Sequence, residues 1–148
     1  MKTILIIFLL GLTFSYDRIG AANYAQKYCN NYNPEYKKYS DQNEENVNFV
    51  SQCISIGGGQ DFEGCEGRDN KGMFKNSADL KKCLISKGWK KTHVPQKGNP
   101  AFTRLGINTM ILSGDQMDLK TLIYCSHTPD RCNAKAGHRY LEIYSLAN

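Results

Sequence analysis

The side chains of this sequence that could serve as nucleophiles or general bases are cysteines and histidines. The chain has 148 residues, among them six cysteines and three histidines. A thiol activated by an imidazole can attack an amide carbonyl, so a suitably placed Cys–His pair would predict a hydrolase. Two places deserve that test: Cys53, inside the run NEENVNFVSQCISIGGG at 43–59, and the pair Cys125 and His127.

Cys125 and His127 stand two residues apart on a predicted strand, so their side chains share a face and could form a dyad. The competing interpretation, which we favour, is that Cys125 is disulfide-bonded, with Cys132 as a nearby partner. The set Cys125, His127, Cys132 and His138 could also be read as a zinc site, but its spacing fits no common structural zinc pattern. We therefore expect no metal and no other cofactor.

The start of the chain predicts secretion. One lysine precedes a short apolar run at 4–12, and small residues follow it, which is typical of a signal peptide at 1–15 cleaved after Ser15. The run is too short to span a membrane. We expect residues 16–148 to form a single domain in the extracellular space or a secretory granule. An even cysteine count there favours up to three disulfides. The candidates are Cys29, Cys53, Cys65, Cys83, Cys125 and Cys132.

Hydrophobic periodicity predicts the elements that must position these side chains. Helical spacing covers 16–32, 46–56 and 78–87, with Asp17, Asn46 and Ser77 as the expected N-caps and glycines 57–59 ending the second helix. Strand-like segments follow at 101–105, 108–113, 119–127 and 138–146, and Gly114-Asp115 predicts a hairpin turn. The order predicts an α+β fold, with three N-terminal helices packed on a C-terminal antiparallel sheet.

Three motifs within this pattern resemble those of a known family. NFVSQC at 48–53 is followed by glycines, MILSG stands at 110–114, and SHTPD stands at 126–130. Together they resemble the putative amidase domain family, which is a papain-like group of cysteine hydrolases of bacterial cell-wall peptidase type. The resemblance covers nearly all of residues 16–148 and implies a papain-like, amidase-type fold.

The resemblance breaks at the positions that carry the family's chemistry. In the family the helix opens Asp-Cys-Thr-Asn-Phe-Val-Ser-Gln, and alignment on Asn48 puts Glu45 at the aspartate and Asn46 at the nucleophilic cysteine. The family's base histidine opens the next motif, where this chain has Asn108. His127 matches a later histidine with an orienting or structural role. The resemblance therefore implies a degenerate cleft of Asn46, Asn108 and His127, with no catalytic residue.

Other residues are poorly placed to replace the lost cysteine. Cys53 follows Asn46 by seven residues, so it lies about 10 Å further along the helix and points toward the core. Ser51 faces another direction. Trp89 follows a helix stop and is expected to pack in the core, with a ligand platform as the alternative, and His93 is expected at the surface.

The charge distribution bears on possible partners. The formal net charge is +5, and residues 64–97 carry nine Lys or Arg against three Asp or Glu. A basic segment can attract an acidic polymer such as an anionic glycan, but a solvated lysine-rich helix face is the simpler interpretation. No nucleic-acid partner is expected, because basic and aromatic residues do not alternate along a stripe.

These observations lead to one preferred hypothesis and two alternatives. The preferred one is a secreted amidase-like domain that has lost cysteine-hydrolase activity and uses its old cleft to bind a peptide, a muropeptide or an anionic glycan. The first alternative is an active secreted cysteine amidase or peptidase acting on cell-wall peptides. The second is a structural protein of an extracellular or granule matrix. The oligomeric state stays open.

Overall fold

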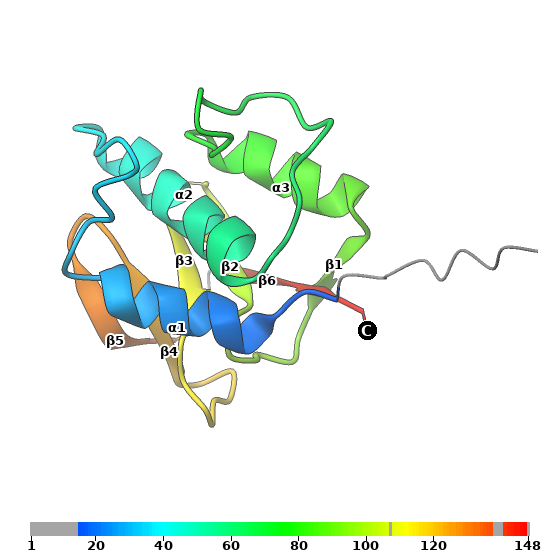
Figure 1. Cartoon of the computed structure of the whole chain (residues 1–148). Helices are drawn as coiled ribbons and strands as arrows, with labels where there is room; N and C mark the ends of the chain where they lie inside the picture. The colour runs from blue at the N-terminus through cyan, green and yellow to red at the C-terminus, as the bar shows by residue number, and fades with distance from the viewer. Residues whose placement is uncertain (1–14, 107, 138–140, 148) are drawn as a thin grey trace, which may run out of the picture.

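Three α-helices and a six-stranded antiparallel sheet make up the fold in the computed structural model, which describes residues 15–106, 108–137 and 141–147 (Figure 1). The expected signal peptide lies outside these residues except for Ser15. The helical elements are α1 (Arg18–Tyr28), α2 (Gln42–Gln52), its π-helical continuation η1 (Cys53–Gly57) and α3 (Ser77–Ser86). The strands are β1 (Trp89–Thr92), β2 (Pro100–Thr103), β3 (Thr109–Leu112), β4 (Leu122–Ser126), β5 (Arg131–Ala136) and β6 (Leu141–Leu146).

The second helix begins four residues earlier than predicted. The Asp41 side chain accepts hydrogen bonds from the backbone N–H groups of Asn43 and Glu44, which makes Asp41 the N-cap. Asn46 therefore lies in the second turn, and its expected role as the cap is wrong. The sequence offers two good caps in this stretch, and the carboxylate of Asp41 also complements the positive end of the helix dipole.

The other two helices also differ from their predicted bounds. Asp17 caps α1 as predicted, by accepting from the N–H of Gly20, but the helix ends at Tyr28, four residues short of the predicted end at 32. For α3 the cap is Asn76 rather than Ser77. The Ser77 hydroxyl donates instead to the carbonyl of Gly106, which ties the start of α3 to the loop before β3.

The sheet order is β1-β6-β2-β3-β4-β5, with every neighbouring pair antiparallel. Strands β2, β3, β4 and β6 lie at the four predicted strand segments, and β3 and β4 pair as expected across the connection that begins near Gly114. Prediction missed β1 and β5, which are the two edge strands. Both carry several exposed polar residues, so neither shows the hydrophobic run of an interior strand.

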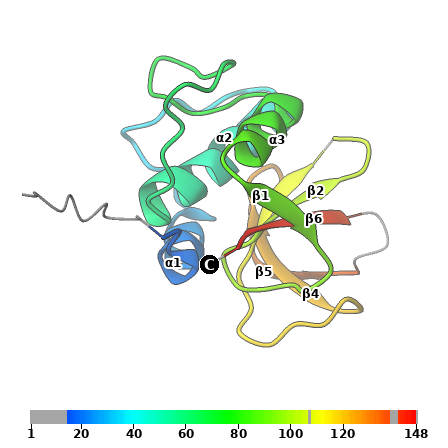
Figure 2. The ribbon, with the colours of Figure 1, turned by 90° about the vertical axis from the view of Figure 1, so that its right-hand side faces the viewer.

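The helices cover one face of the sheet, as Figure 2 shows. The main core lies between them and includes Phe49, Ile54, Leu84, Trp89 and Ile111, all buried. A smaller apolar cluster of Ala101, Met110, Leu112, Leu122 and Ile143 occupies the opposite face. Trp89 is 2% exposed, its indole N–H donates to Gln60, and its ring packs edge-on against Tyr16, so it is a core residue and not a ligand platform.

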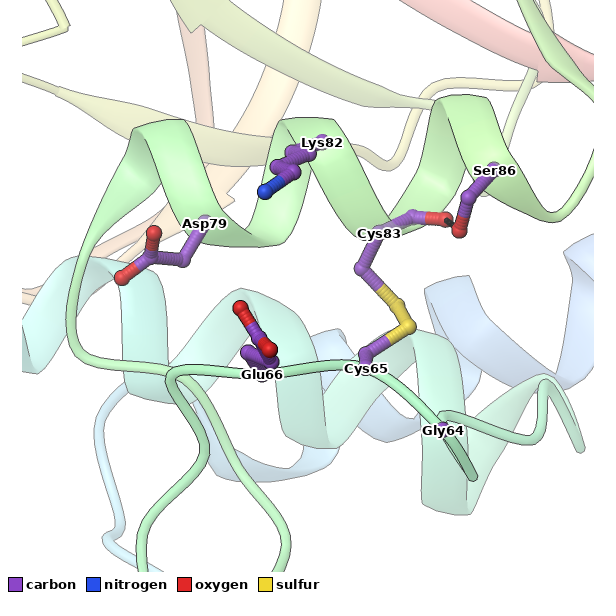
Figure 3. Close-up of a pocket in the computed structure, with 7 residues that line it drawn as sticks. All are labelled: Gly64, Cys65, Glu66, Asp79, Lys82, Cys83 and Ser86. Carbon is purple, nitrogen blue, oxygen red and sulfur yellow. Dashed lines mark hydrogen bonds between the residues drawn. A yellow bond between two sulfur atoms is a disulfide. The ribbon is translucent and has the colours of Figure 1, made fainter.

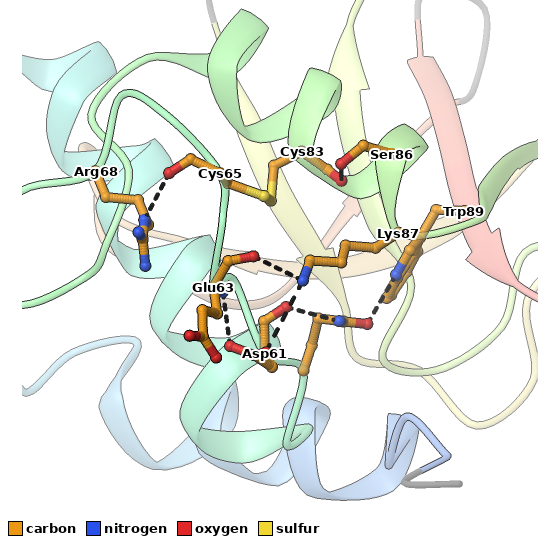
Figure 4. Close-up of a disulfide and its surroundings, with 9 residues drawn as sticks. Asp61, Glu63, Cys65, Arg68, Cys83, Ser86, Lys87 and Trp89 are labelled. Carbon is orange, nitrogen blue, oxygen red and sulfur yellow. Dashed lines mark hydrogen bonds and ion pairs between the residues drawn. A yellow bond between two sulfur atoms is a disulfide. The ribbon is translucent and has the colours of Figure 1, made fainter.

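Four of the six candidate cysteines form disulfides. Cys29–Cys132 joins the end of α1 to β5, and Cys65–Cys83 joins the loop after η1 to α3 (Figure 4). Cys53 and Cys125 are free and fully buried. The expected pairing of Cys125 with Cys132 is wrong, because the fold brings Cys29 from 103 residues away to a Cα–Cα distance of 5.4 Å from Cys132.

Candidate functional site

The two positions that the sequence singled out, Asn46 and Asn108, meet in the structure. The Asn46 amide nitrogen lies 3.4 Å from the Asn108 amide oxygen and 3.4 Å from the backbone carbonyl oxygen of Thr128. Asn46 comes from the second turn of α2, Asn108 from the residue before β3, and Thr128 from the turn between β4 and β5. Three segments that are far apart in the sequence therefore converge at this asparagine pair.

The asparagine pair is buried on one side and open on the other. Asn46 is 1% exposed, and its amide oxygen has no hydrogen-bond partner among the described residues, whereas Asn108 is exposed. A buried amide oxygen without a partner costs about 1–3 kcal/mol, so this atom is poised to accept a bond from a bound molecule or water. Because Asn46 sits in the second turn, the helix dipole acts on it less than the sequence suggested.

His127 lies next to this pair but is held away from it. Its ring is 2% exposed, with Nδ1 2.7 Å from a carboxylate oxygen of Glu45 and Nε2 2.8 Å from the carbonyl oxygen of Tyr28. The ring stacks on Phe49 at a centroid distance of 3.8 Å and packs against Tyr32 at 4.2 Å. A carbonyl only accepts, so Nε2 carries a proton and donates, and both ring nitrogens are engaged.

Glu45 is the residue of this region that sequence reasoning undervalued. One carboxylate oxygen faces His127, and the other accepts a bond from the Tyr39 N–H at 2.6 Å. The buried Glu45–His127 pair thus links α2 to the loop after α1 and to the turn after β4. The sequence feature that could have pointed to Glu45 was its place beside Asn46, at the family's aspartate position. Its partner His127 could not be found this way, because it lies 82 residues away along the chain.

A cavity of about 220 Å³ opens beside Asn108. It is lined by Asn108, Thr109, Met110, Tyr124, Ser126, Thr128, Pro129 and Arg131. The hydroxyl oxygens of Thr109 and Thr128 are buried and have no hydrogen-bond partner within the described part of the chain. No acidic side chain is among the lining residues, and Arg131 contributes a guanidinium group. The sequence had marked Asn108 as a cleft position and placed Met110, Ser126, Thr128 and Pro129 in motifs, but it had not marked Thr109, Tyr124 or Arg131.

The candidate substitute nucleophiles lie elsewhere. Cys53 is fully buried, and burial, together with the nearby Cys125 thiol, raises its pKa well above the ordinary value for cysteine. The Ser51 hydroxyl donates to the carbonyl of Asn48 and accepts from the N–H of Phe74, deep in the core. A thiol with a raised pKa is a poor nucleophile, so burial removes both groups from the chemistry of the site.

The geometry also bears on the hypotheses for the histidines, and it supports neither the Cys125–His127 dyad nor the zinc set. The engaged nitrogens of His127 leave none directed at Cys125, whose thiol instead lies 4.0 Å from the amide oxygen of Asn133. Cys132 is in a disulfide, so the suggested zinc set loses one ligand, and His138 lies outside the described residues. His93 is exposed, as predicted.

A larger hollow of about 270 Å³ lies beside the Cys65–Cys83 disulfide, between α3 and the loop that precedes it (Figure 3). Glu66, Asp79 and Lys82 contribute mixed charge to it, and Ser86 and Gly64 complete its rim. Its lining shares no residue with the asparagine pair or the smaller cavity. We place the candidate site at the smaller cavity because that is where the motif positions and the unpartnered polar atoms gather.

The lysine-rich segment 64–97 is partly neutralised in the fold. Four of its lysines pair with carboxylates: Lys81 and Lys91 with Glu142, Lys87 with Asp61, and Lys97 with Asp115. This pairing favours the solvated-face interpretation over an acidic-polymer site. Over the described ranges, no helix combines the length and apolar character needed to cross a membrane.

Comparison with known proteins adds a family and one relative. The sequence profile of the putative amidase domain family matches residues 15–115, about two thirds of the chain, a span that includes Asn46 and Asn108 and ends before His127. The chain is 50% identical over 48 residues to the uncharacterized protein YhbB of Bacillus subtilis (strain 168), covering 32% of this chain and 14% of that protein. The match therefore spans about a seventh of that relative's length. No solved structure matches the chain.

Proposed function

This chain belongs to the putative amidase domain family, and we propose that it is a secreted, disulfide-bonded, papain-like member that binds peptides and does not cleave them. The observation that carries the proposal is the contact between Asn46 and Asn108, which stand where the resemblance puts the nucleophile and the base. An asparagine amide neither titrates near neutral pH nor attacks a carbonyl, so this pair performs neither role.

The surroundings of the asparagine pair support the proposal. Within the described ranges, the hydrogen-bond partners of the Asn46 side chain are an amide oxygen and a backbone oxygen, not a thiol, a carboxylate or an imidazole. His127 keeps both nitrogens on Glu45 and Tyr28. General acid–base catalysis needs a titrating group within reach of the reacting atoms, and among the residues that the structure describes none is hydrogen-bonded to this pair.

The chemistry of the pair suits recognition of a peptide or a muropeptide. Asparagine amides offer both donors and acceptors, which match the alternating N–H and C=O groups of an extended peptide. Asn46 has an amide oxygen free to accept, and the exposed Asn108 can be reached from solvent. We favour a peptide over an anionic glycan because half of the lysines of 64–97 are paired with carboxylates of the same chain.

The direct test combines binding and cleavage. Purified protein is incubated with peptidoglycan and with soluble muropeptides, binding is measured by calorimetry, and released products are separated by chromatography. We expect binding with no product. Release of products that a thiol reagent abolishes would show an active cysteine hydrolase instead.

A repair experiment tests the alignment of the motifs. Asn46→Cys together with Asn108→His should place a thiol next to an imidazole, since the two wild-type side chains already approach within 3.4 Å. Such a pair lowers the pKa of the thiol below that of free cysteine. The pKa is read from the pH dependence of the alkylation rate, with the single variant Asn46→Cys as the control. A thiol that titrates identically in both variants would argue against the assigned positions.

A further inference from the structure

We propose that the cavity beside Asn108 is a carboxylate-binding subsite that receives the C-terminal end of a peptide. This inference deepens the peptide-binding function proposed above and rests on it. Three observations carry it: unpartnered hydroxyl groups, a guanidinium that makes no ion pair within the described residues, and a size that suits the end of a ligand.

The first observation is the set of buried polar atoms that lack partners. Thr109 is fully buried and lines the cavity, and its hydroxyl oxygen makes no hydrogen bond among the described residues. Thr128 also lines the cavity, and its hydroxyl oxygen is likewise buried without a partner among these residues. Folded proteins satisfy nearly all buried polar groups, so two unpartnered hydroxyls on residues that line one cavity indicate that a ligand completes them.

The second observation is the charge of the lining. Arg131 is exposed at the start of β5, and in the described part of the chain its guanidinium makes no ion pair. The neighbouring carboxylate of Asp130 accepts instead from the Tyr32 hydroxyl at 3.0 Å. No aspartate or glutamate lines the cavity. A guanidinium next to hydroxyl and amide donors matches the geometry of a carboxylate, which can accept two parallel N–H bonds from one arginine.

The third observation is the size of the cavity. Pockets that enclose a whole drug-sized ligand span about 300–1,000 Å³, and this one has about 220 Å³. It therefore suits the last residue of a longer chain. Because Asn108 belongs both to the cavity lining and to the asparagine pair, a peptide that ends in the cavity would run directly past Asn46.

The experiment uses the full mature protein and three probes. N-acetyl-Ala-Ala carries a free carboxylate, its C-terminal amide is the matched neutral probe, and inorganic phosphate tests for a general oxyanion site. Dissociation constants are measured by NMR titration, which also reports the amide shifts of Thr109 and Thr128. We expect the acid to bind at least tenfold more tightly than the amide and to shift both threonine signals.

The variants assign that preference to Arg131. Arg131→Gln should weaken binding of the acid at least tenfold and leave the amide within twofold, whereas Arg68→Gln, an exposed arginine on another loop, should change neither. Equal binding of acid and amide would overturn the inference and leave peptide binding intact. Failure of both dipeptides to shift the threonine signals, or tighter binding of phosphate than of the acid, would also overturn it. Muropeptide binding is scored separately and decides the proposed function.

Discussion

At the scale of single residues, Glu45 and His127 act as a unit that holds the site together. The imidazole is enclosed by two aromatic rings, and each of its nitrogens faces an oxygen within 2.8 Å. Buried charges are tolerated when they are paired and fully hydrogen-bonded, and removing one partner leaves the other buried and unpaired. The pair therefore fixes the turn whose next residue, Thr128, contacts Asn46.

His127→Gln and Glu45→Gln should each destabilise the fold because each leaves its buried partner incompletely paired. We expect His127→Gln to lower the free energy of unfolding by about 3 kcal/mol or more, because it leaves the buried Glu45 carboxylate without its partner. Chemical denaturation measures the free energy of unfolding, and the double variant completes a cycle. The loss in the double variant should be smaller than the sum of the single losses. Strict additivity would contradict a direct pair.

The two free thiols give a second prediction at this scale. Cys53 and Cys125 are fully buried, and burial raises the pKa of the Cys53 thiol well above its ordinary value. A thiol reagent should therefore react with neither in the native protein and with two per chain in denaturant. One reactive thiol in the native state would point to a cysteine nucleophile, and none in denaturant would indicate a third disulfide.

At the scale of elements, α2 shows how a helix can start away from the residue that a motif suggests. Asp41 takes the capping role, which leaves Asn46 inside the helix with its side chain free to meet Asn108. The same competition between neighbouring polar residues gives α3 the N-cap Asn76 in place of the predicted Ser77. Asparagine, aspartate and serine cap with similar strength, so the sequence alone cannot choose between candidates a few residues apart.

Asp41→Ala should lower the free energy of unfolding by about 1 kcal/mol, the usual loss of an N-cap. Asp41→Asn is the matched control, since its amide oxygen can still accept from the N–H groups of Asn43 and Glu44. Thermal and chemical denaturation should place the control within a few tenths of a kcal/mol of wild type. If Asp41→Ala left the free energy of unfolding unchanged, the helix would have to begin at another residue.

Glu142 on β6 joins α3 and β1 through Lys81 and Lys91. Their hydrogen bonds hold the pKa of its carboxyl below the ordinary value of 4.5. The ionised form is thus favoured in the folded state, so its contribution is complete above pH 4.5 and is lost as the pH falls through the lowered folded pKa. The contribution should stay below about 1 kcal/mol, because the side chains are partly exposed.

The measurement compares wild type with Glu142→Gln by denaturation across pH 2–7. The difference in the free energy of unfolding should be constant near neutrality and shrink below pH 4.5. A difference that grows on acidification would reverse the sign and contradict the ion pairs.

What the sequence predicted follows a physical division. The interior strands β2, β3, β4 and β6 carry enough apolar residues for the sequence pattern to predict strands. The edge strands β1 and β5 border solvent, and their exposed polar residues give the pattern of a loop. The meeting of Asn46 with Asn108 was predictable from the motifs. The partner of Glu45 was not, because it lies 82 residues away along the chain. The cavity was not either, because it depends on how the turn after β4 packs against the start of β3.

At the scale of the whole molecule, the two disulfides act over very different lengths of chain. Cys29–Cys132 closes a separation of 103 residues and joins the helical layer to the far edge of the sheet, while Cys65–Cys83 spans 18 residues. A crosslink removes more conformational freedom from the unfolded chain when it closes a longer loop.

Replacing Cys29 and Cys132 together by alanine should therefore cost more stability than replacing Cys65 and Cys83. The expected losses are about 4–5 kcal/mol and about 3 kcal/mol. Both double variants are compared with wild type by denaturation under non-reducing conditions. An equal or reversed order would show that local packing around each bridge outweighs loop length.

The position of β6 has a consequence for how the protein folds during its synthesis. This strand lies between β1 and β2, so residues 141–146 occupy the interior of the sheet and not its border. These residues are synthesised after β1–β5, and until they emerge β1 and β2 keep unpaired edges that invite association with other chains. The sheet therefore closes only once residues 141–146 are available, and a nascent chain paused before 141 needs protection of those two edges.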